Sequence, residues 1–180
     1  MVAGADSAAK PSMACSEDRT VVHQADPVND NREMDGKMPA PFVFLDHTAD
    51  AKFQAFGRTI EEAFAHAAHA LLSLMWDRKK VRPLKRVPVR IEGRDEPQLL
   101  VGFLEEILFL WDARFFLVGG VEEIRIVPGS PEGVLTAFFA GEKCCQGQTI
   151  HGEVKAITYN DMIIEHRADG IVMIQVVVDI

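Results

Sequence analysis

The order of its hydrophobic patterns constrains the fold of this chain more than any other feature. Between residues 41 and 114, strand-like alternation is followed by a helical stripe, then by another strand and another helix. After residue 114, only strand patterns follow. This order is typical of α+β proteins, because an α/β fold alternates strands and helices throughout. We therefore predict one α+β domain over residues 41–180, with a largely antiparallel β-sheet and two α-helices packed on it.

Each predicted helix begins with a capping signal. Thr59 is followed three residues later by Glu62, and Asp95 is followed by Gln98 with Pro97 between them. The second helix runs to about residue 114 and is apolar nearly all round, so we expect neighbours on more than one side of it. The first helix carries a single apolar stripe at helical spacing, formed by Ile60, Phe64, Ala67, Ala68, Leu71 and Met75.

Turn-forming residues separate the strand segments. Gly57 ends the first segment, Pro128 with Gly129 and then Gly141 interrupt the later ones, and Asp169–Gly170 indicates a hairpin between the last two. The segments read FVFLDHTADAKFQAFG, RVPVRIEG, VEEIRIVP, GVLTAFFAG, EVKAITYNDMII and IVMIQVVVDI.

Residues 1–40 have a different character. They are rich in Asp, Ser, Asn, Ala and Pro and show no sustained hydrophobic period. Such a segment buries too little apolar surface to offset the entropy of ordering. We predict that residues 1–40 form a disordered N-terminal extension.

The net charge limits the partners that this protein can bind, and its cysteine content favours a cytoplasmic location. The formal net charge of -8 disfavours sequence-independent binding to a phosphate backbone. The three cysteines, Cys15, Cys144 and Cys145, form no disulfide framework, which indicates a reducing compartment. The first residues lack a secretory pattern, and the stretch LLVGFLEEILFLW is shorter than the roughly 20 residues of a membrane span. We expect no membrane association.

No catalytic template is recognisable. The sequence contains no G-x-S-x-G elbow, P-loop, GxGxxG or spaced CxxC pair, and most of its serines precede residue 41. We therefore assign no catalytic residue.

Two polar clusters have an ordinary explanation beside a functional one. Glu62, His66 and His69 share one side of the first helix at metal-ligand spacing, but such short spacings most often mark a solvated helix face. The connection RKKVRPLKRVPVR concentrates basic residues that suit RNA or an acidic partner. It lacks the interleaved aromatic residues of single-strand binders, and a solvated loop and strand edge is the more usual explanation for such a run.

Acidic residues on two strands are harder to explain. Asp46 and Asp50 share one side of the first strand segment, and Asp179 shares a side of the last strand with Gln175. A water-exposed strand end explains either acid alone, whereas two carboxylates that meet repel each other unless a proton or cation lies between them. The terminal carboxylate of Ile180 adds a third group, and such an all-oxygen set suits Ca²⁺ or Mg²⁺ rather than Zn²⁺. Spacing alone does not bring residue 50 beside residue 179.

Three collinear motifs in this chain resemble the archease family. They are LDHTADAKFQAFGRTIEEAFAHAAHAL at residues 45–71, GEVKAITYNDM at residues 152–162 and the chain end VVVDI. The resemblance covers roughly residues 41–180, and residues 78–148 are its least diagnostic part. The sequence departs from the family at Asn160, where many members have a His after the Tyr.

The resemblance implies a small α+β protein that is not itself an enzyme. It implies a protein activator of the RtcB-type RNA ligase, which joins RNA ends in tRNA splicing and RNA repair. The activator promotes the GTP- and metal-dependent guanylylation of the ligase and its multiple turnover, so that it meets RNA only through the ligase.

The family's metal site maps onto Asp50, Asp179 and Ile180. Ca²⁺ is the expected ion, with Mg²⁺ and Mn²⁺ as alternatives. Three further residues that lie in family motifs are candidate neighbours of the site without an assigned role: His47, Lys155 and Tyr159.

Two other classes of function stay open from the residues themselves. One is a metal-dependent hydrolase or nuclease that uses the same carboxylates, although a two-metal hydrolase needs more acidic ligands than two side chains and a terminus. The other is an RNA-binding or chaperone module that uses the basic connection.

Overall fold

The computed structural model describes residues 39–47, 50–129, 131–144 and 150–180. The predicted disordered extension, residues 1–40, lies almost entirely outside the described residues and stays a prediction. The described elements are, in chain order, β1 (Phe42–Leu45), β2 (Ala51–Gly57), α1 (Ile60–Met75), the 3-10 helix η1 (Arg78–Lys80), β3 (Lys85–Gly93), α2 (Glu96–Arg114), β4 (Phe116–Val127), β5 (Gly133–Lys143), β6 (Ala156–His166) and β7 (Val172–Asp179).

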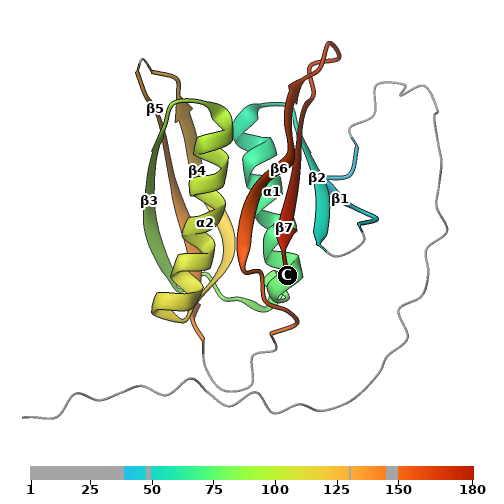
Figure 1. Ribbon diagram of the computed structural model, residues 1–180. Coiled ribbons are helices and arrows are strands. Elements are labelled where there is room, and N and C mark those ends of the chain that lie inside the picture. Colours follow the sequence, from blue (N-terminus) through green and yellow to red (C-terminus); the bar gives the residue numbers. More distant parts are fainter. Residues whose placement is uncertain (1–38, 48–49, 130, 145–149) are drawn as a thin grey trace, which may run out of the picture. The chain divides into compact units, whose positions relative to one another are not determined.

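These strands form two antiparallel sheets rather than one (Figure 1). The four-stranded sheet has the order β1-β2-β7-β6, and the three-stranded sheet has the order β3-β5-β4. The predicted α+β class with antiparallel strands is confirmed. The division into two sheets was not predicted, because alternation identifies a strand without identifying the strand with which it pairs.

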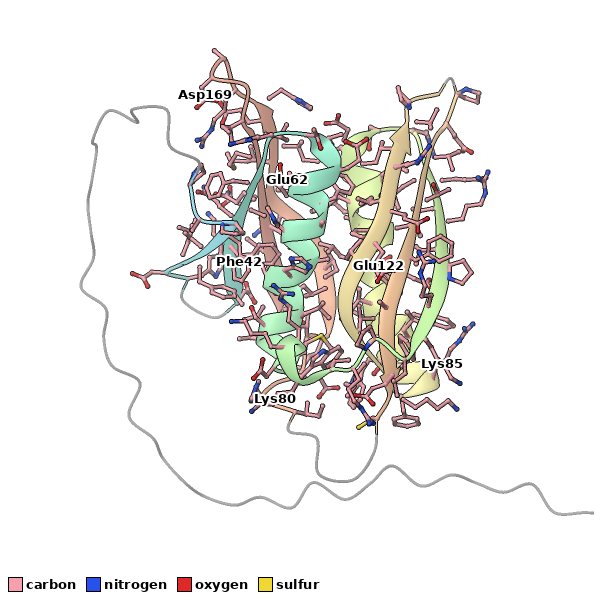
Figure 2. All side chains as sticks on the ribbon, turned by 180° about the vertical axis from the view of Figure 1, so that it is seen from behind. Phe42, Glu62, Lys80, Lys85, Glu122 and Asp169 are labelled. Atoms are coloured by element: carbon pink, nitrogen blue, oxygen red, sulfur yellow. The ribbon has the colours of Figure 1, made fainter. Side chains whose placement is uncertain are left out.

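The two helices lie between the sheets and contact both of them (Figure 1). α1 packs on β2 and β7 and also contacts β4, beside which it lies in the view from behind (Figure 2). α2 packs on the three-stranded sheet and also contacts β6. Contact with both sheets explains why α2 is apolar nearly all round, as predicted; its buried residues are Leu99, Leu100, Val101, Phe103, Leu104, Ile107, Leu108 and Leu110.

The junction between β2 and α1 is built as its sequence predicts. The Oγ1 atom of Thr59 accepts a hydrogen bond from the amide of Glu62 at 3.2 Å, and the carboxylate of Glu62 accepts one from the amide of Arg58 at 2.7 Å. A Cβ added at Gly57 would lie 2.3 Å from the amide nitrogen of Ala63. The capping signal is therefore confirmed, and the glycine allows the strand to approach the first turn of the helix closely.

The start of α2 repeats this arrangement. Oδ1 of Asp95 accepts a hydrogen bond from the amide of Gln98 at 2.9 Å, and Oε1 of Gln98 accepts one from the amide of Arg94 at 3.1 Å. The helix ends at Arg114, the predicted residue.

Gly141 does not interrupt a strand, contrary to the prediction. β5 continues through it to Lys143, and β4 begins at Phe116, ahead of the predicted segment. A Cβ at Gly141 would lie 2.0 Å from the carbonyl oxygen of Leu117 on β4. This glycine therefore serves a close approach of two paired strands rather than a break between segments.

The four-stranded sheet has two distinct faces. Phe53 and Ala55 of β2 belong to the buried core together with Ile174 and Val176 of β7 and residues of α1. The other face, here called the outer face, carries the side chains of alternating residues, which include Lys52 and Gln54 on β2 and Gln175, Val177 and Asp179 on β7.

Candidate metal centre

The pairing of β2 with β7 brings the positions of Asp50 and Asp179 to the same end of the four-stranded sheet. Ala51 pairs with Val178 and Lys52 with Val177, so the next position in this antiparallel register sets Asp50 opposite Asp179. Ile180 follows Asp179 directly. Two of the predicted ligands therefore lie at one end of the outer face, although 129 positions separate them in the sequence.

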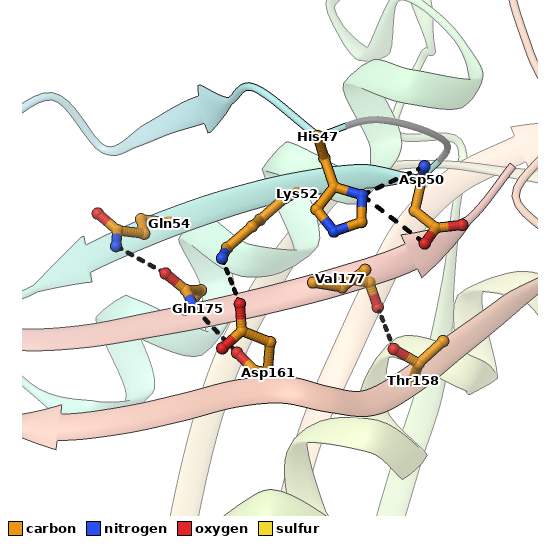
Figure 3. Close-up of polar contacts among 8 residues, drawn as sticks. All are labelled: His47, Asp50, Lys52, Gln54, Thr158, Asp161, Gln175 and Val177. Carbon is orange, nitrogen blue, oxygen red and sulfur yellow. Dashed lines mark hydrogen bonds and ion pairs between the residues drawn. The ribbon is translucent and has the colours of Figure 1, made fainter.

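His47 contacts Asp50 in two ways (Figure 3). The Nδ1 atom of His47 lies 3.4 Å from the amide nitrogen of Asp50 and 3.7 Å from its Oδ2 atom. An unprotonated Nδ1 accepts a hydrogen bond from the amide, whereas a protonated Nδ1 pairs with the carboxylate. The predicted neighbour His47 is thus in contact with the predicted ligand Asp50.

Lys155 secures the end of β7. Its amide donates to the carbonyl oxygen of Asp179 at 2.8 Å, and its Nζ atom donates to the main-chain oxygen of Ile180 at 2.9 Å. The ammonium group compensates part of the negative charge that gathers here. Lys155 is therefore also a neighbour of the predicted site, through contacts with Asp179 and Ile180.

Tyr159 lies at the start of a bulge in β6. Thr158 pairs with Val177, and Ile163 with Gln175, so a five-residue step on β6 faces a two-residue step on β7. Tyr159 is 58% exposed and Asn160 is also exposed. The bulge therefore exposes Asn160 to solvent, and this is the position where the chain departs from the family motif.

A polar network that was not predicted from the sequence crosses the outer face (Figure 3). Lys52 forms an ion pair with Asp161 of the bulge. The amide group of Gln175 donates to the carbonyl oxygen of Asp161 at 2.9 Å and accepts from the amide of Gln54 at 2.9 Å. Gln175 is only 5% exposed, and this polar residue within an apolar strand was the available signal.

The polar side chains of α1 have structural partners. Nδ1 of His66 lies 2.5 Å from the carbonyl oxygen of Phe56, and Glu62 caps the helix. Burial first of all, and then the neighbouring Arg78 and His66, lower the pKa of His69 to about 4. Glu62, His66 and His69 are therefore half-buried, and the side of α1 that carries them is not fully solvated.

The basic connection is largely neutralised within the chain. Arg82 pairs with Glu142, Arg90 pairs with Glu92, and Lys80 lies 3.5 Å from Asp77. Arg86 pairs with both Glu122 and Glu123 and also lies over the ring of Phe138, with 4.2 Å from Cζ to the ring centroid. Paired guanidinium groups offer little net charge to a polyanion.

Within the described residues, no three His, Cys, Asp or Glu side chains gather closely enough to hold a metal ion. The predicted metal site differs from such a cluster, because two of its ligands are side chains and the third is the main-chain carboxylate of Ile180. Its donors are all oxygen atoms, the chemistry that hard divalent ions prefer. None of the helices described here is long and apolar enough to span a membrane.

Comparison with known proteins gives a consistent result. The model of the Archease protein family (MTH1598/TM1083) matches residues 42–180. Protein archease of Methanosarcina barkeri is 40% identical over 142 residues, which cover 77% of this chain and 95% of that protein. Protein archease of Pyrococcus furiosus is 38% identical over 136 residues, which cover 75% and 95%.

A solved structure has the same fold. The solution structure of Methanobacterium thermoautotrophicum protein 1598 matches with a TM-score of 0.68 and 33% identity, and the match covers 78% of this chain and 99% of that one. The chain therefore belongs to the archease family.

Proposed function

We propose that this protein activates an RtcB-type RNA ligase in tRNA splicing and RNA repair. In this role it promotes guanylylation of the ligase and its multiple turnover, and it works in the cytoplasm. Membership of the archease family supports the proposal, since activation of this ligase is what the resemblance of the motifs implies.

The activator works by contact and not by chemistry of its own. The sequence has no recognisable nucleophile motif and no phosphate-binding loop, which favours this role over a hydrolase or nuclease. The pairing of Arg82, Arg86 and Arg90 with acidic residues of the same chain favours contact with RNA through the ligase over direct binding.

The observation that carries the proposal is the register that sets Asp50 opposite Asp179, with Ile180 following. Together these residues would hold one hard divalent ion, Ca²⁺ in the first instance and Mg²⁺ or Mn²⁺ otherwise. Such an ion supplies positive charge between carboxylates that otherwise repel one another. The residues themselves form an acidic, exposed end of the sheet, which would meet the ligase near its metal-dependent guanylylation centre.

The test measures guanylylation and RNA joining by the ligase at limiting divalent metal, with and without this protein. Asp50→Ala and Asp179→Ala should abolish the stimulation while the circular dichroism spectrum stays that of the parent. Glu165→Ala is the matched control, because it removes an exposed carboxylate of β6 whose register partner Met173 is six residues from Asp179. Residues added after Ile180 should reduce stimulation less, since they move one carboxylate and keep both side chains.

Two results would contradict the proposal. The first is full stimulation by the Asp179→Ala protein and by the extended protein at limiting metal. The second is turnover of RNA or nucleotide by the purified protein alone that is lost in Asp50→Ala, which would favour the hydrolase alternative.

A further inference from the structure

Lys52 lies close to the candidate metal centre on the same face of the sheet. It is two residues from Asp50 along β2, and its register partner Val177 is two residues from Asp179 along β7. Diagonal neighbours on paired strands are about 7–8 Å apart, which is within reach of a long side chain. An ammonium group at this position can therefore reach toward both carboxylates.

The structure holds the Lys52 ammonium elsewhere. Its Nζ atom contacts Oδ2 of Asp161, and the Lys52 side chain points away from Asp50 (Figure 3). The Lys52 side chain is 18% exposed and that of Asp161 is 51% exposed, so the lysine is the more buried partner of this ion pair.

The backbone around Asp161 is arranged for this contact. Asp161 has a φ of 52°, in the left-handed region that Asp and Asn adopt more readily than most residues. Its carbonyl oxygen accepts the hydrogen bond from Gln175, which is almost completely buried. β7 lies between β6, which carries Asp161, and β2, which carries Lys52. The bulge in β6 thereby allows the carboxylate of Asp161 to contact Lys52 across β7.

We propose that Asp161 is a positioning residue that holds Lys52 away from Asp50 and Asp179, so that their carboxylates remain available to a divalent cation. The inference rests on the proposed metal centre. A released Lys52 would act as an internal counter-charge for the same carboxylates and would compete with the ion.

The test is a calorimetric titration of the full chain with Ca²⁺, without the ligase. Asp161→Asn removes the charge but keeps the tolerance for a left-handed backbone and the carbonyl that Gln175 contacts. It should weaken Ca²⁺ binding about three- to fivefold, the upper part of the effect expected of one partly exposed ion pair. Lys52→Met combined with Asp161→Asn should restore the affinity to within about twofold of the parent. Asp161→Gly, which adopts the left-handed conformation freely, should show the same loss as Asp161→Asn.

Two further measurements separate release of Lys52 from a general change of charge. In metal-free Asp161→Asn, nuclear Overhauser effects should appear between the ε protons of Lys52 and the β protons of Asp179, and Ca²⁺ should abolish them. Glu165→Gln makes the same charge change on β6, at a residue 55% exposed whose partner is Arg167. Its register partner Met173 is six residues from Asp179, roughly 20 Å along the strand and beyond the screening length of about 8–10 Å, so its Ca²⁺ affinity should be unchanged.

The outcomes are distinguishable. A parent protein that binds no Ca²⁺ would refute the metal centre and this inference with it. A parent that binds Ca²⁺ and an Asp161→Asn protein that binds it equally tightly would refute the inference alone. Equal weakening in Glu165→Gln, or no contact between Lys52 and Asp179 in metal-free Asp161→Asn, would do the same.

Discussion

Asp50 and Asp179 take opposing positions one residue beyond the pair that Ala51 forms with Val178. Like charges at opposing positions of an antiparallel pair are destabilising, in the range of about 0.2–1 kcal/mol. The two acids therefore oppose folding slightly unless a cation lies between them, and the stability of the protein should respond to divalent metal.

The first prediction concerns this response. In a chelator, Asp179→Asn should have the same melting temperature as the parent or a slightly higher one, because one of two repelling charges is gone. Millimolar Ca²⁺ should raise the melting temperature of the parent and leave that of the variant unchanged. The measurement is thermal unfolding followed by circular dichroism. An equal Ca²⁺ effect on both proteins would place the ion elsewhere.

The second prediction concerns Gly57. A methyl group there would lie 2.3 Å from the amide nitrogen of Ala63 and 2.8 Å from the carbonyl oxygen of Thr59, both backbone atoms. Gly57→Ala should lower the free energy of unfolding by about 2–3 kcal/mol, because the helix must move to make room. The control is Gly120→Ala on β4, where an added Cβ meets nothing within 4 Å, and urea unfolding should show little change for it.

The third prediction concerns pH. Burial lowers the pKa of His69 from 6.5 to about 4, so the unfolded chain takes up a proton at a pH where the folded chain does not. The stability from this residue is complete above pH 6.5 and is lost progressively as the pH falls toward 4.

His69→Gln should remove that dependence. Between pH 7 and pH 5 the parent should lose about 1–2 kcal/mol more stability than the variant, after allowance for partial solvent screening. Urea unfolding at the two pH values measures this difference, with His151→Gln at an exposed position as the control. A difference as large for His151→Gln would argue against burial as the cause.

The fourth prediction concerns the buried end of an ion pair. The carboxylate of Glu142 is 4% exposed and accepts three hydrogen bonds of 2.7–2.9 Å from Arg82, whose side chain is 65% exposed. Arg82→Ala should destabilise the protein by about 3 kcal/mol, since it removes a guanidinium charge and two charge-assisted hydrogen bonds from a buried carboxylate. In the exposed pair of Arg90 with Glu92, Arg90→Ala should cost less than about 0.5 kcal/mol. Similar losses for both variants in urea unfolding would contradict this account.

The fifth prediction concerns the N-terminal extension. Deletion of residues 1–38 should change the melting temperature by less than about 2 °C, because the composition of this segment favours disorder. The deletion retains Pro41, whose carbonyl oxygen accepts a hydrogen bond from the amide of Phe56. A large drop in melting temperature would show that the deleted residues pack on the domain.

The sequence by itself determined the local elements. Thr59 with Glu62 and Asp95 with Gln98 marked the starts of α1 and α2, because a helix cap is a hydrogen bond between residues three positions apart. Alternation located the strands and placed Gln175 and Asp179 on one side of β7, since this period is a property of a single strand. The archease motifs then named the candidate ligands. The turn at Asp169–Gly170 correctly predicted that β6 pairs with β7, but no signal identified the other strand partners.

Only the tertiary structure decided which distant residues meet. The register of β2 with β7 sets Asp50 opposite Asp179, and the bulge in β6 brings Asp161 to Lys52, 109 positions away in the sequence. The split into two sheets and the pairing of the basic connection with acidic residues have the same origin. Such contacts depend on which strands pair and in which register. Register depends on which face of each strand the core buries and on the turns that join the strands, and the alternation of any one strand does not identify its partner.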